Sequence, residues 1–384
     1  MSQGKLRFFH LIEKFDLRGA EVFASQLSSK LASFGHYNAL CSIYRSDFSG
    51  FPIAESVDFF SMGARKAGPW AKIGVQPSVV MKTRKLINKY RPDIIIAHGS
   101  DTMKYVSLAN MFRSGPVIIY RNIGLASYWV HNQLHVNINR WILHKMDVVI
   151  SVSQVSRDDF VALYRFPADR VHVILNAVEC QKYLAMNVEK ERDVFRNRLG
   201  LSSTDKILVS IGSLSPEKNQ AELLNLVKEL GDSSLHLFLA GDGQLRPNLL
   251  ATTKNLQLQH RVHFLGMQPD IAPILAAADI FVLPSKSEGL PGVLIEAGLA
   301  GLPAVAYDVG GVKEVISADT TGIIVPARNY PTFKSAVISL LGDAEKRRKM
   351  GSIARQTYPD RFDIEGIARQ YEAVCFKLLQ EKRR

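Results

Sequence analysis

Short apolar runs alternate with amphipathic segments along most of the chain, and this alternation limits the fold more than any other feature. The apolar runs contain few polar residues, so strands formed from them would be buried on both faces, as in parallel sheets covered by helices. Right-handed strand–helix–strand units of this kind build doubly wound α/β domains. The predicted strands are residues 6–12, 38–43, 57–60, 93–97, 116–120, 147–152, 206–211, 235–239, 261–264, 280–283, 303–306 and 323–325. The predicted helices are residues 20–34, 75–90, 102–112, 131–145, 217–230, 270–277, 291–300 and 330–341.

The 384 residues are enough for two such domains. A polar, charged stretch at 178–204 has weak periodicity and predicts a linker between them. We therefore expect an N-terminal Rossmann-like domain over 1–178 and a C-terminal one over 179–360. The segment 361–384 has apolar residues at helical spacing and predicts a long terminal helix. Because ligands bind beyond the carboxyl ends of parallel strands, we expect the active site in a cleft between the domains.

The formal net charge of +12 is concentrated in the first half of the chain. Residues 1–180 hold 22 Lys and Arg against 13 Asp and Glu, whereas residues 181–384 hold 26 against 23. A basic surface favours anionic partners such as phosphorylated substrates or an anionic membrane surface, although a basic excess without any partner is the alternative. The candidate membrane contacts are Arg65–Lys66 and Lys82–Arg84–Lys85. No motif typical of nucleic-acid binding is present, so we expect no nucleic-acid partner.

The three cysteines, Cys41, Cys180 and Cys375, have neither a disulfide nor a zinc-site spacing, which fits a reducing compartment. The N-terminus does not resemble a signal peptide, and no apolar run approaches the roughly 18 residues that a spanning helix needs. We therefore expect a cytoplasmic protein whose basic half can rest on the cytoplasmic face of the membrane.

The segment 279–315 carries the strongest functional signal. A buried strand ends in a short loop, and Pro291 suits the first position of the helix that follows. The free N–H groups at such a helix start form an anion site, which the helix dipole strengthens. Glu288 and Glu296 flank this site, and each carboxylate can accept hydrogen bonds from a pair of hydroxyls. On spacing alone, a capping carboxylate and a solvent-facing helix glutamate are the alternative.

This segment resembles the signature of retaining glycosyltransferases of the GT-B fold, family 4, in which seven residues separate two glutamates. The matching positions are Pro284, Ser285, Glu288, Gly289, Glu296, Ala297, Gly301, Pro303, Val305, Ala306, Gly310, Gly311, Glu314 and Gly322. Other family-like segments are Arg18–Gly19–Ala20–Glu21, Asn176–Glu179 and Gly241–Asp242–Gly243, so the resemblance covers most of the chain. It implies two doubly wound Rossmann-like domains facing across a cleft, with a C-terminal helix that crosses back to the N-terminal domain.

The resemblance also implies how a nucleotide-diphosphate sugar would be bound. Glu296 would accept hydrogen bonds from the donor ribose, and Glu288 would contact hydroxyls of the transferred sugar. Lys218 matches the lysine that neutralises the leaving diphosphate, a role that suits a point charge. Lys218 and Glu288 are therefore predicted catalytic residues. The other predicted donor contacts are Gly19, Ser213, Gly241, Gly289, Leu290 and Gly292.

Ser213 departs from the family pattern, because many members have an arginine there. A serine hydroxyl can donate one hydrogen bond to phosphate but brings no charge. Arg18 or Arg121 could compensate for the missing cation. Without compensation, turnover could be slow or absent, so a degenerate member that binds nucleotide-sugar without turnover is the alternative.

The N-terminal half is expected to hold the acceptor, a glycan or a lipid-linked molecule. His98 and Arg121 end two predicted strands, where side chains face a ligand, and both are predicted catalytic residues. Arg18 and Asn122 are the predicted acceptor contacts. A histidine satisfied within the core is the alternative for His98.

The chain has no Asp-x-Asp in a context typical of metal-dependent nucleotide-sugar sites. Since Lys218 and the helix dipole can stabilise a leaving diphosphate, we expect no metal and no cofactor. No residue is an obvious covalent nucleophile, so a front-face displacement fits the retention that the resemblance implies. The predicted function is transfer of a hexose or N-acetylhexosamine in cell-envelope polysaccharide biosynthesis. An epimerase or a sugar-phosphate hydrolase on the same fold is an alternative, whereas no GxGxxG follows the first strand to support a dehydrogenase.

Overall fold

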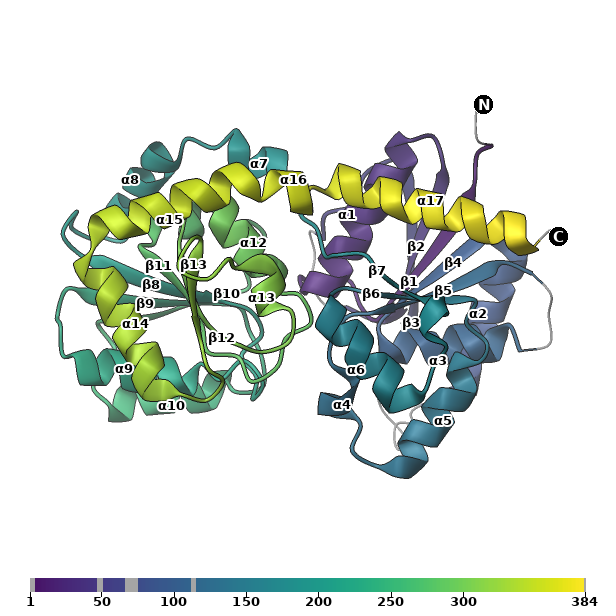
Figure 1. Cartoon of the computed structure of the whole chain (residues 1–384), viewed down its shortest axis with the longest axis horizontal. Coiled ribbons are helices and arrows are strands. Elements are labelled where there is room, and N and C mark those ends of the chain that lie inside the picture. Colours follow the sequence, from purple (N-terminus) through teal and green to yellow (C-terminus); the bar gives the residue numbers. More distant parts are fainter. Residues whose placement is uncertain (1–3, 47–50, 66–74, 112–114, 383–384) are drawn as a thin grey trace. The chain divides into compact units, whose positions relative to one another are not determined.

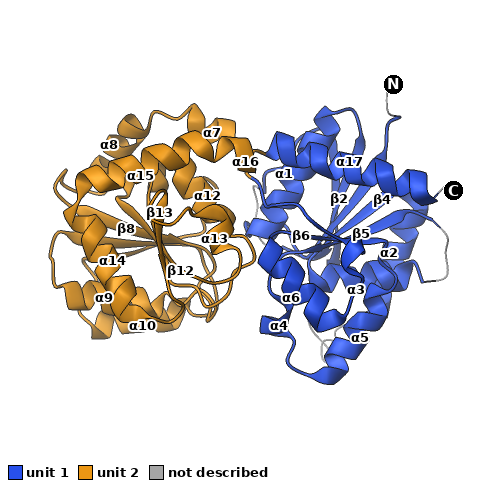
Figure 2. Cartoon of the chain, viewed as in Figure 1, with its two compact units in different colours: residues 1–177, 364–384 blue, residues 178–363 orange. Residues whose placement is uncertain are grey.

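The computed structural model describes residues 4–46, 51–65, 75–111 and 115–382. It divides into two compact units, residues 1–177 with 364–384 (unit 1) and residues 178–363 (unit 2), which Figures 1 and 2 show. Each unit is a parallel sheet with helices on both faces, so the predicted doubly wound α/β class is confirmed. Lys66 and residue 112, the predicted end of one helix, lie outside the described residues.

The sheet of unit 1 has the strand order β3-β2-β1-β4-β5-β6-β7, and all its pairings are parallel. Its strands are β1 (Arg7–Ile12), β2 (Tyr37–Tyr44), β3 (Val57–Ala64), β4 (Ile94–His98), β5 (Val117–Asn122), β6 (Val148–Ser151) and β7 (Val171–Val173). Its helices are α1 (Gly19–Ser33), α2 (Pro77–Tyr90), α3 (Ser100–Ala109), α4 (Ala126–Trp129), α5 (Gln133–Leu143), α6 (Gln154–Tyr164), the 3-10 helix η2 (Ala168–Arg170) and α17 (Ile364–Lys382).

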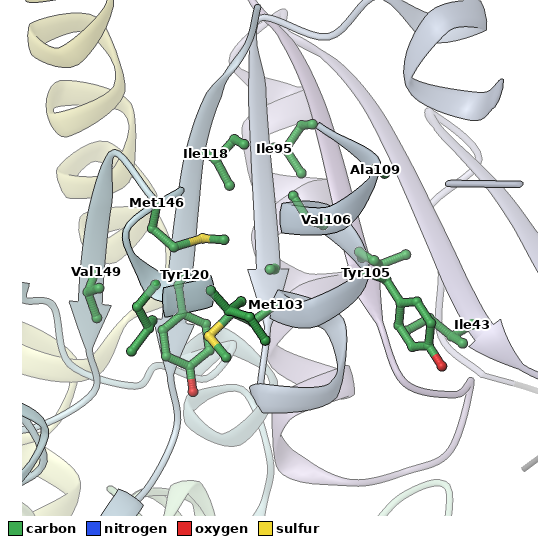
Figure 3. Close-up of a cluster of buried hydrophobic side chains, with 14 of the residues drawn as sticks. Ile43, Ile95, Met103, Tyr105, Val106, Ala109, Ile118, Tyr120, Met146 and Val149 are labelled. Atoms are coloured by element: carbon green, nitrogen blue, oxygen red, sulfur yellow. The ribbon is translucent and has the colours of Figure 1, made fainter. Parts of the chain in front are cut away.

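Residues of each strand alternate between the two faces of this sheet and build two separate cores. On one face, strand residues pack against α2, α3, α5 and α6. Figure 3 shows part of that core, with Ile95 and Ile118 of the sheet near Val106 of α3. On the other face, Phe8, Ile96 and their neighbours pack against α1 and α17.

The C-terminal helix α17 belongs to unit 1, although the chain reaches it only after completing unit 2 (Figure 2). Tyr371 and Cys375 of α17 are fully buried in the core that α1 also contacts. A hydrogen bond of 2.7 Å from His36 Nε2 to Glu372 fixes the same helix beside β2. The predicted return of the terminal helix to the N-terminal domain is therefore confirmed.

The sheet of unit 2 has the strand order β10-β9-β8-β11-β12-β13, again with only parallel pairings. Its strands are β8 (Lys206–Ile211), β9 (Leu235–Ala240), β10 (Val262–Gly266), β11 (Ile280–Leu283), β12 (Ala304–Tyr307) and β13 (Gly322–Val325). Its helices are α7 (Cys180–Leu184), α8 (Val188–Arg198), α9 (Ala221–Leu230), α10 (Arg246–Asn255), α11 (Ala272–Ala277), α12 (Gly292–Leu299), α13 (Val312–Val315), α14 (Tyr330–Gly342), α15 (Ala344–Thr357) and α16 (Pro359–Phe362).

The predicted linker at 178–204 is wrong, because most of this stretch folds as α7 and α8 of unit 2. Two arginines attach α8 to the sheet: Arg192 and Arg196 donate to Asp279 at 2.8 and 2.9 Å. Asp279 in turn accepts a hydrogen bond of 2.8 Å from the backbone N–H of Ile207 in β8. The helix is therefore held by charge, and its sequence carries too few apolar residues to reveal a buried face.

The strand order of each sheet reverses once. The reversal lies between β1 and β4 in unit 1 and between β8 and β11 in unit 2. At such a switch point, the loops after two neighbouring strands diverge and leave a crevice at the carboxyl edge of the sheet. The predicted donor residues Lys218 and Glu288 follow β8 and β11, and His98 ends β4 next to β1. The topology therefore places candidate site residues at both switch points.

Candidate functional site

The loops that follow β8 and β9 contact each other through glycines. Gly212 and Gly241 both have positive φ, and a Cβ on Gly241 would lie 2.1 Å from the carbonyl oxygen of Gly212. A Cβ on Gly243 would likewise lie 2.5 Å from the carbonyl oxygen of Leu214. Backbone hydrogen bonds join the loops, among them one of 3.0 Å from Leu214 N–H to Asp242. These glycines permit a backbone approach that no larger residue allows, and they fix the loop that carries Lys218.

The loop between β11 and α12 is fixed from two sides. The N–H of Lys286 donates to Glu217 of the β8 loop at 2.7 Å, and the N–H of Gly311 donates to Gly289 at 2.8 Å. Gly310 has a φ of 53°, and a Cβ there would lie 1.8 Å from the carbonyl oxygen of Glu288. Three loops thus hold Glu288 at the carboxyl edge of the unit 2 sheet.

Lys218 and Glu288 form an ion pair in this arrangement, with 2.6 Å between Lys218 Nζ and Glu288 Oε1. The Glu288 side chain is 8% exposed and that of Lys218 is 22% exposed, so the pair is shielded from solvent but still reachable. They are 70 positions apart in sequence, and the pairing of β8 with β11 brings their loops together. A cation held this way beside the start of α12 can attract the phosphates of a ligand.

Glu296 lies on α12 and accepts a hydrogen bond of 2.8 Å from the hydroxyl of Tyr183 on α7. Burial raises the pKa of Glu296 to about 7, and the hydrogen bond from Tyr183 and the charge of Lys182 oppose that rise. The carboxyl is therefore poised between its neutral and ionised forms near neutral pH. Its second oxygen can accept a hydrogen bond from a ligand hydroxyl.

The helix α12 begins at Gly292, and Pro291 is its extended N-cap residue, one position earlier than predicted. The N-cap side chain makes no hydrogen bond, so nothing from Pro291 covers the first N–H groups of the helix. Leu290 is buried and anchors the loop. The helix start therefore offers backbone donors between Glu288 and Glu296, although binding by Gly289, Leu290 and Gly292 stays a prediction.

Ser213 lies in the same loop as Lys218, and its carbonyl oxygen accepts a hydrogen bond of 2.8 Å from the buried side chain of Gln220. This bond shapes the loop without involving the Ser213 hydroxyl. Arg246, the first residue of α10, directly follows the glycine loop that packs on Gly212. Its Nε is buried and has no hydrogen-bond partner among the described residues, and no motif in the sequence pointed to this residue.

In unit 1, Asn38, His10 and His98 form a buried chain of hydrogen bonds at the switch point, which we call the relay. His10 Nε2 lies 3.1 Å from Asn38 Oδ1, and His10 Nδ1 lies 3.2 Å from His98 Nε2. Asn38 Nδ2 donates to the carbonyl of His36, so Asn38 Oδ1 must be the acceptor for His10. Burial lowers the pKa of His10 to about 4 and that of His98 well below its ordinary value, so both rings are neutral.

These contacts set the tautomers of both rings. His10 donates from Nε2 to Asn38, which leaves its Nδ1 to accept from His98 Nε2–H. His98 Nδ1 then carries a lone pair and has no hydrogen-bond partner among the described residues. The relay therefore leaves His98 Nδ1 as an acceptor, for example for a hydroxyl. His98 is thus both hydrogen-bonded within the core, as the alternative prediction had it, and able to accept a hydrogen bond from a ligand.

Arg121 is not on the ligand-facing surface that its place at the end of β5 predicted. Its side chain is 1% exposed, and its guanidinium lies 3.8 Å from the ring centre of Phe23 and donates to Asn176 Oδ1 at 2.8 Å. Burial lowers its pKa, whereas Tyr371 and Glu21 nearby raise it. Because side chains alternate between the two faces of a strand, that of Arg121 points under α1 and α17. There it contacts both helices from β5.

Asn122 is also used internally: its Nδ2 donates to Ser151 Oγ at 3.2 Å and to the carbonyl of Ser156 at 3.1 Å. These bonds fix the start of α6, so its amide is not free for the predicted acceptor contact. Arg18, by contrast, is exposed at the N-cap of α1, and a Cβ on Gly19 would meet nothing within 4 Å. The space around Gly19 and Arg18 is therefore open to a ligand.

Several residues that hold the candidate sites together could not be predicted from the sequence. They are His10, Glu21, Asn38, Tyr183 and Gln220. Glu21 stood within a family-like segment, and burial raises its pKa to about 7 with one oxygen left without a partner. Tyr183 was concealed inside the predicted linker. No spacing connects His10 with Asn38, since only the pairing of β1 with β2 brings them together.

Two protein-family models match the chain. The model of glycosyl transferases group 1 matches residues 191–357, and the model of glycosyltransferase family 4 matches residues 17–182. The first match contains the Lys218, Glu288 and Glu296 site, and the second contains Asn38 and His98 but begins after His10. Together the two matches cover most of the chain.

Curated relatives share less than 30% of their residues with this chain in the two examples that follow. An N-acetyl-alpha-D-glucosaminyl L-malate synthase of Bacillus anthracis is 29% identical over 246 residues, which are 64% of this chain and 63% of that protein. The N-acetylgalactosamine-N,N'-diacetylbacillosaminyl-diphospho-undecaprenol 4-alpha-N-acetylgalactosaminyltransferase of Campylobacter jejuni is 23% identical over 334 residues, covering 85% of this chain and 88% of that protein. The first match thus spans less than two thirds of that relative's length.

Among solved structures, HepE of Anabaena in complex with UDP and glucose has a TM-score of 0.81 and 21% sequence identity. The superposition covers 96% of this chain and 99% of that chain. At this identity the likeness concerns the fold, and it extends over both units and not one sheet alone.

Proposed function

Because this chain belongs to the family 4, group 1 glycosyltransferases and has their GT-B fold, we propose that it transfers a hexose or N-acetylhexosamine from a nucleoside-diphosphate sugar to an acceptor. The proposed acceptor is a growing glycan or a lipid-linked glycan of the cell envelope. The proposed place of action is the cytoplasmic face of a membrane. Within the described residues, no helix has the length and apolarity needed to cross a membrane.

The observation that carries this proposal is the Lys218–Glu288 pair of 2.6 Å beside the start of α12. When a donor binds, its diphosphate takes the place of the Glu288 carboxylate as the partner of Lys218, and Glu288 turns to hydroxyls of the sugar. The first N–H groups of α12 add donors for the phosphate oxygens. The negative charge that develops on the leaving diphosphate is then stabilised by groups already in position.

The proposed nucleotide is UDP, since HepE, whose fold matches over nearly the whole chain, was solved with UDP. Glu296 would accept hydrogen bonds from the ribose, with Tyr183 holding the other carboxyl oxygen. This arrangement orients the acceptor oxygen of Glu296 and limits its rotation. A donor that lacks a ribose hydroxyl would leave a half-buried carboxyl without a partner, which disfavours binding.

A lipid-linked acceptor is favoured by the name of the Campylobacter relative, which describes a diphospho-undecaprenol acceptor and an alpha product. An alpha product from an alpha-linked donor would correspond to retention. We propose front-face displacement without a metal, in which the acceptor hydroxyl approaches from the side of the leaving phosphate. His98 Nδ1 would accept a hydrogen bond from a sugar hydroxyl, and Arg18 and Gly19 would border the acceptor.

The test combines binding with turnover. We expect UDP, but not GDP, ADP or TDP, to raise the melting temperature in the presence of EDTA, and Glu296→Ala to abolish the rise. Release of UDP from UDP-sugar should depend on an added acceptor, and the product should keep the alpha configuration by NMR. A rise that needs a divalent metal would overturn metal independence, and an inverted product would overturn retention.

Ser213 favours a second candidate, a member that binds donor without turnover, because the loop lacks the cation found in many relatives. Tight UDP-sugar binding with no acceptor-dependent release across a panel of glycan acceptors would support that candidate. If the missing cation is the cause, Ser213→Arg should increase any residual transfer. A fully active wild-type protein would exclude the second candidate.

A further inference from the structure

One side of unit 1 carries apolar side chains that no described residue covers. Trp129 of α4 and Leu134, Ile138 and Trp141 of α5 are 63%, 63%, 46% and 52% exposed, and we call these four residues the aromatic face. The three residues on α5 follow the spacing i, i+4, i+7, so they form one stripe along the helix. Large apolar residues gathered in this way are unusual on a soluble surface and mark an interaction site.

The stripe is separate from the core face of α5. Val136, Ile142 and Leu143 are buried against α3 and α6, so the helix is fixed to the sheet by its other side. The exposed stripe therefore contributes nothing to the core. In Figure 1, α5 runs on the side of unit 1 opposite α17, which leaves α5 at the outside of its helix layer.

Basic residues accompany the aromatic face, although α6, which packs on α4, carries Asp158 and Asp159. Residues 133–146, which are α5 and the turn after it, contain Arg140 and Lys145 but no Asp or Glu, and His131, His135 and His144 are exposed around α5. On the same helix layer, α2 presents the exposed residues Lys82, Arg84 and Lys85 and has no acidic residue. An apolar, tryptophan-containing stripe on a helix layer that also presents these cations is complementary to the headgroup and acyl boundary of an anionic bilayer.

The aromatic face closely follows the candidate acceptor site along the chain. Ile123, which directly follows β5, is 39% exposed, and its Cδ1 lies 3.5 Å from the Cβ position of Gly99, the residue after His98. The chain then runs from Ile123 into α4 and α5. A short stretch of chain thus connects the switch point of unit 1 to the stripe.

We propose that the aromatic face is the membrane-docking surface of this protein, with Trp129, Leu134, Ile138 and Trp141 inserted among anionic lipids and the basic residues of α2 held at the headgroups. This inference rests on the proposed function, since a lipid-linked acceptor would be reached from the bilayer. It assigns insertion to α4 and α5, whereas the sequence alone indicated only basic clusters.

The tryptophans themselves can report docking. The chain has three, and Trp70 lies outside the described residues, so Trp70→Phe leaves only the two on the aromatic face. With vesicles of phosphatidylcholine and phosphatidylglycerol in equal parts, we expect this variant's emission to shift to shorter wavelength. Vesicles of phosphatidylcholine alone should give a much smaller shift, because the cations then have no counter-charge.

A matched pair of variants tests the location. Ile138→Gln together with Leu134→Gln should reduce cosedimentation with the anionic vesicles at least about tenfold, because apolar insertion is lost while the charge is kept. Ile338→Gln on α14 is the control, since Ile338 is 47% exposed against 46% for Ile138. Lys82→Gln with Lys85→Gln should weaken binding and make it less sensitive to salt.

Three results would overturn the proposal. Equal cosedimentation of the Ile138 and Ile338 variants would move the surface elsewhere, and equal binding to neutral and anionic vesicles would remove the role of charge. A dimer in sedimentation velocity that Ile138→Gln dissociates would assign the face to a second copy of the chain. UDP-induced stabilisation of the same variants should be unchanged, so a failure of docking can be distinguished from a failure of the proposed donor site.

Discussion

At the scale of single residues, the proposed donor site depends on a charge pair whose partners are both partly withdrawn from water. Glu288 is buried beneath the loop that Gly310 and Gly311 hold, and Lys218 reaches it from the neighbouring loop. Removing one member of such a pair leaves the other without compensation, which costs more than the pair itself contributes. The same pair must separate when a diphosphate binds, so its geometry affects both stability and turnover.

We predict that Lys218→Met reduces transfer by about 10²- to 10³-fold, because the leaving diphosphate loses its cation. The melting temperature should also fall, since Glu288 remains buried without a partner. Initial rates with saturating donor and thermal denaturation measure the two effects. Lys334→Met is the control, because Lys334 pairs with Glu229 at 2.8 Å on the exposed surface and should change neither quantity appreciably. Transfer by Lys218→Met at the wild-type rate would contradict the assignment.

The histidine relay gives a prediction about pH. Burial lowers the pKa of His10 to about 4 from 6.5, so the unfolded chain binds more protons than the folded chain between these values. The stability that His10 contributes is therefore present above pH 6.5 and is lost as the pH falls toward 4, by up to about 3 kcal/mol. His10→Gln, which does not titrate, should flatten the fall in the free energy of unfolding over this range. Chemical denaturation at several pH values checks the difference, and parallel curves for the two proteins would contradict it.

The sequence revealed the site only where one short segment contains the chemistry. Glu288 and Glu296 stand eight positions apart on one loop and helix, so their proximity could be predicted. His10, Asn38 and His98 come from three strands, and only the strand order β2-β1-β4 brings their side chains together. The position of Arg121 at a strand end could be predicted from the sequence. The face of the sheet on which its side chain lies could not, because only some side chains at a strand end point toward a ligand.

At the scale of elements, the carboxyl edge of the unit 2 sheet is shaped by contacts between loops more than by side chains. Gly212, Gly241, Gly243 and Gly310 each allow one backbone to approach another. Such contacts need both a permissive φ and an absent Cβ. They explain how a short loop can hold Glu288 mainly through contacts between backbones.

We predict that Gly310→Ala impairs donor binding more than stability alone explains. Its Cβ would lie 1.8 Å from the carbonyl oxygen of Glu288, so the loop must move. Gly301→Ala is the matched control, because Gly301 also has positive φ but a Cβ there would meet nothing within 4 Å. Both variants should lose about 1 kcal/mol or more of stability to backbone strain. Only Gly310→Ala should weaken UDP binding in calorimetry, and equal affinities would show that the contact does not position Glu288.

Element prediction succeeded where buried strands carry continuous apolar runs, as in β8 and β11, whose bounds match the predicted ones. It failed where a helix is fixed by charge. The α8 sequence has few apolar residues, and Arg192 and Arg196 attach it to Asp279 in a way that periodicity cannot reveal. The helices α6, α10 and α15 and the strand β7 were also not predicted, since their apolar positions are sparse or short.

At the scale of the whole molecule, the two units differ in how the chain builds them. Unit 2 is continuous from residue 178 to 363, whereas unit 1 is completed only when α17 returns. Ile364, Ile367, Ala368, Tyr371 and Cys375 of α17 are each no more than 3% exposed in the core of unit 1. Burial of large apolar side chains contributes about 1.5–3 kcal/mol each, so the loss of this helix is comparable to the total stability of a typical domain.

We therefore predict different behaviour for the two units when they are expressed alone. Residues 178–363 should fold and bind UDP, because the Lys218–Glu288 pair, Tyr183, Glu296 and the whole β8–β13 sheet lie within them. Residues 1–177 should be unstable, because the face of the sheet that carries Phe8 and Ile119 lacks the part of its cover that α17 supplies. A fusion of 1–177 to 364–384 through a short flexible linker should restore cooperative unfolding, which circular dichroism can measure. If residues 1–177 alone unfold cooperatively at the same temperature as the fusion, α17 is not an integral part of unit 1. If residues 178–363 fold but do not bind UDP, the donor site needs a contribution from unit 1, and the open space at Arg18 and Gly19 becomes the first place to look for it.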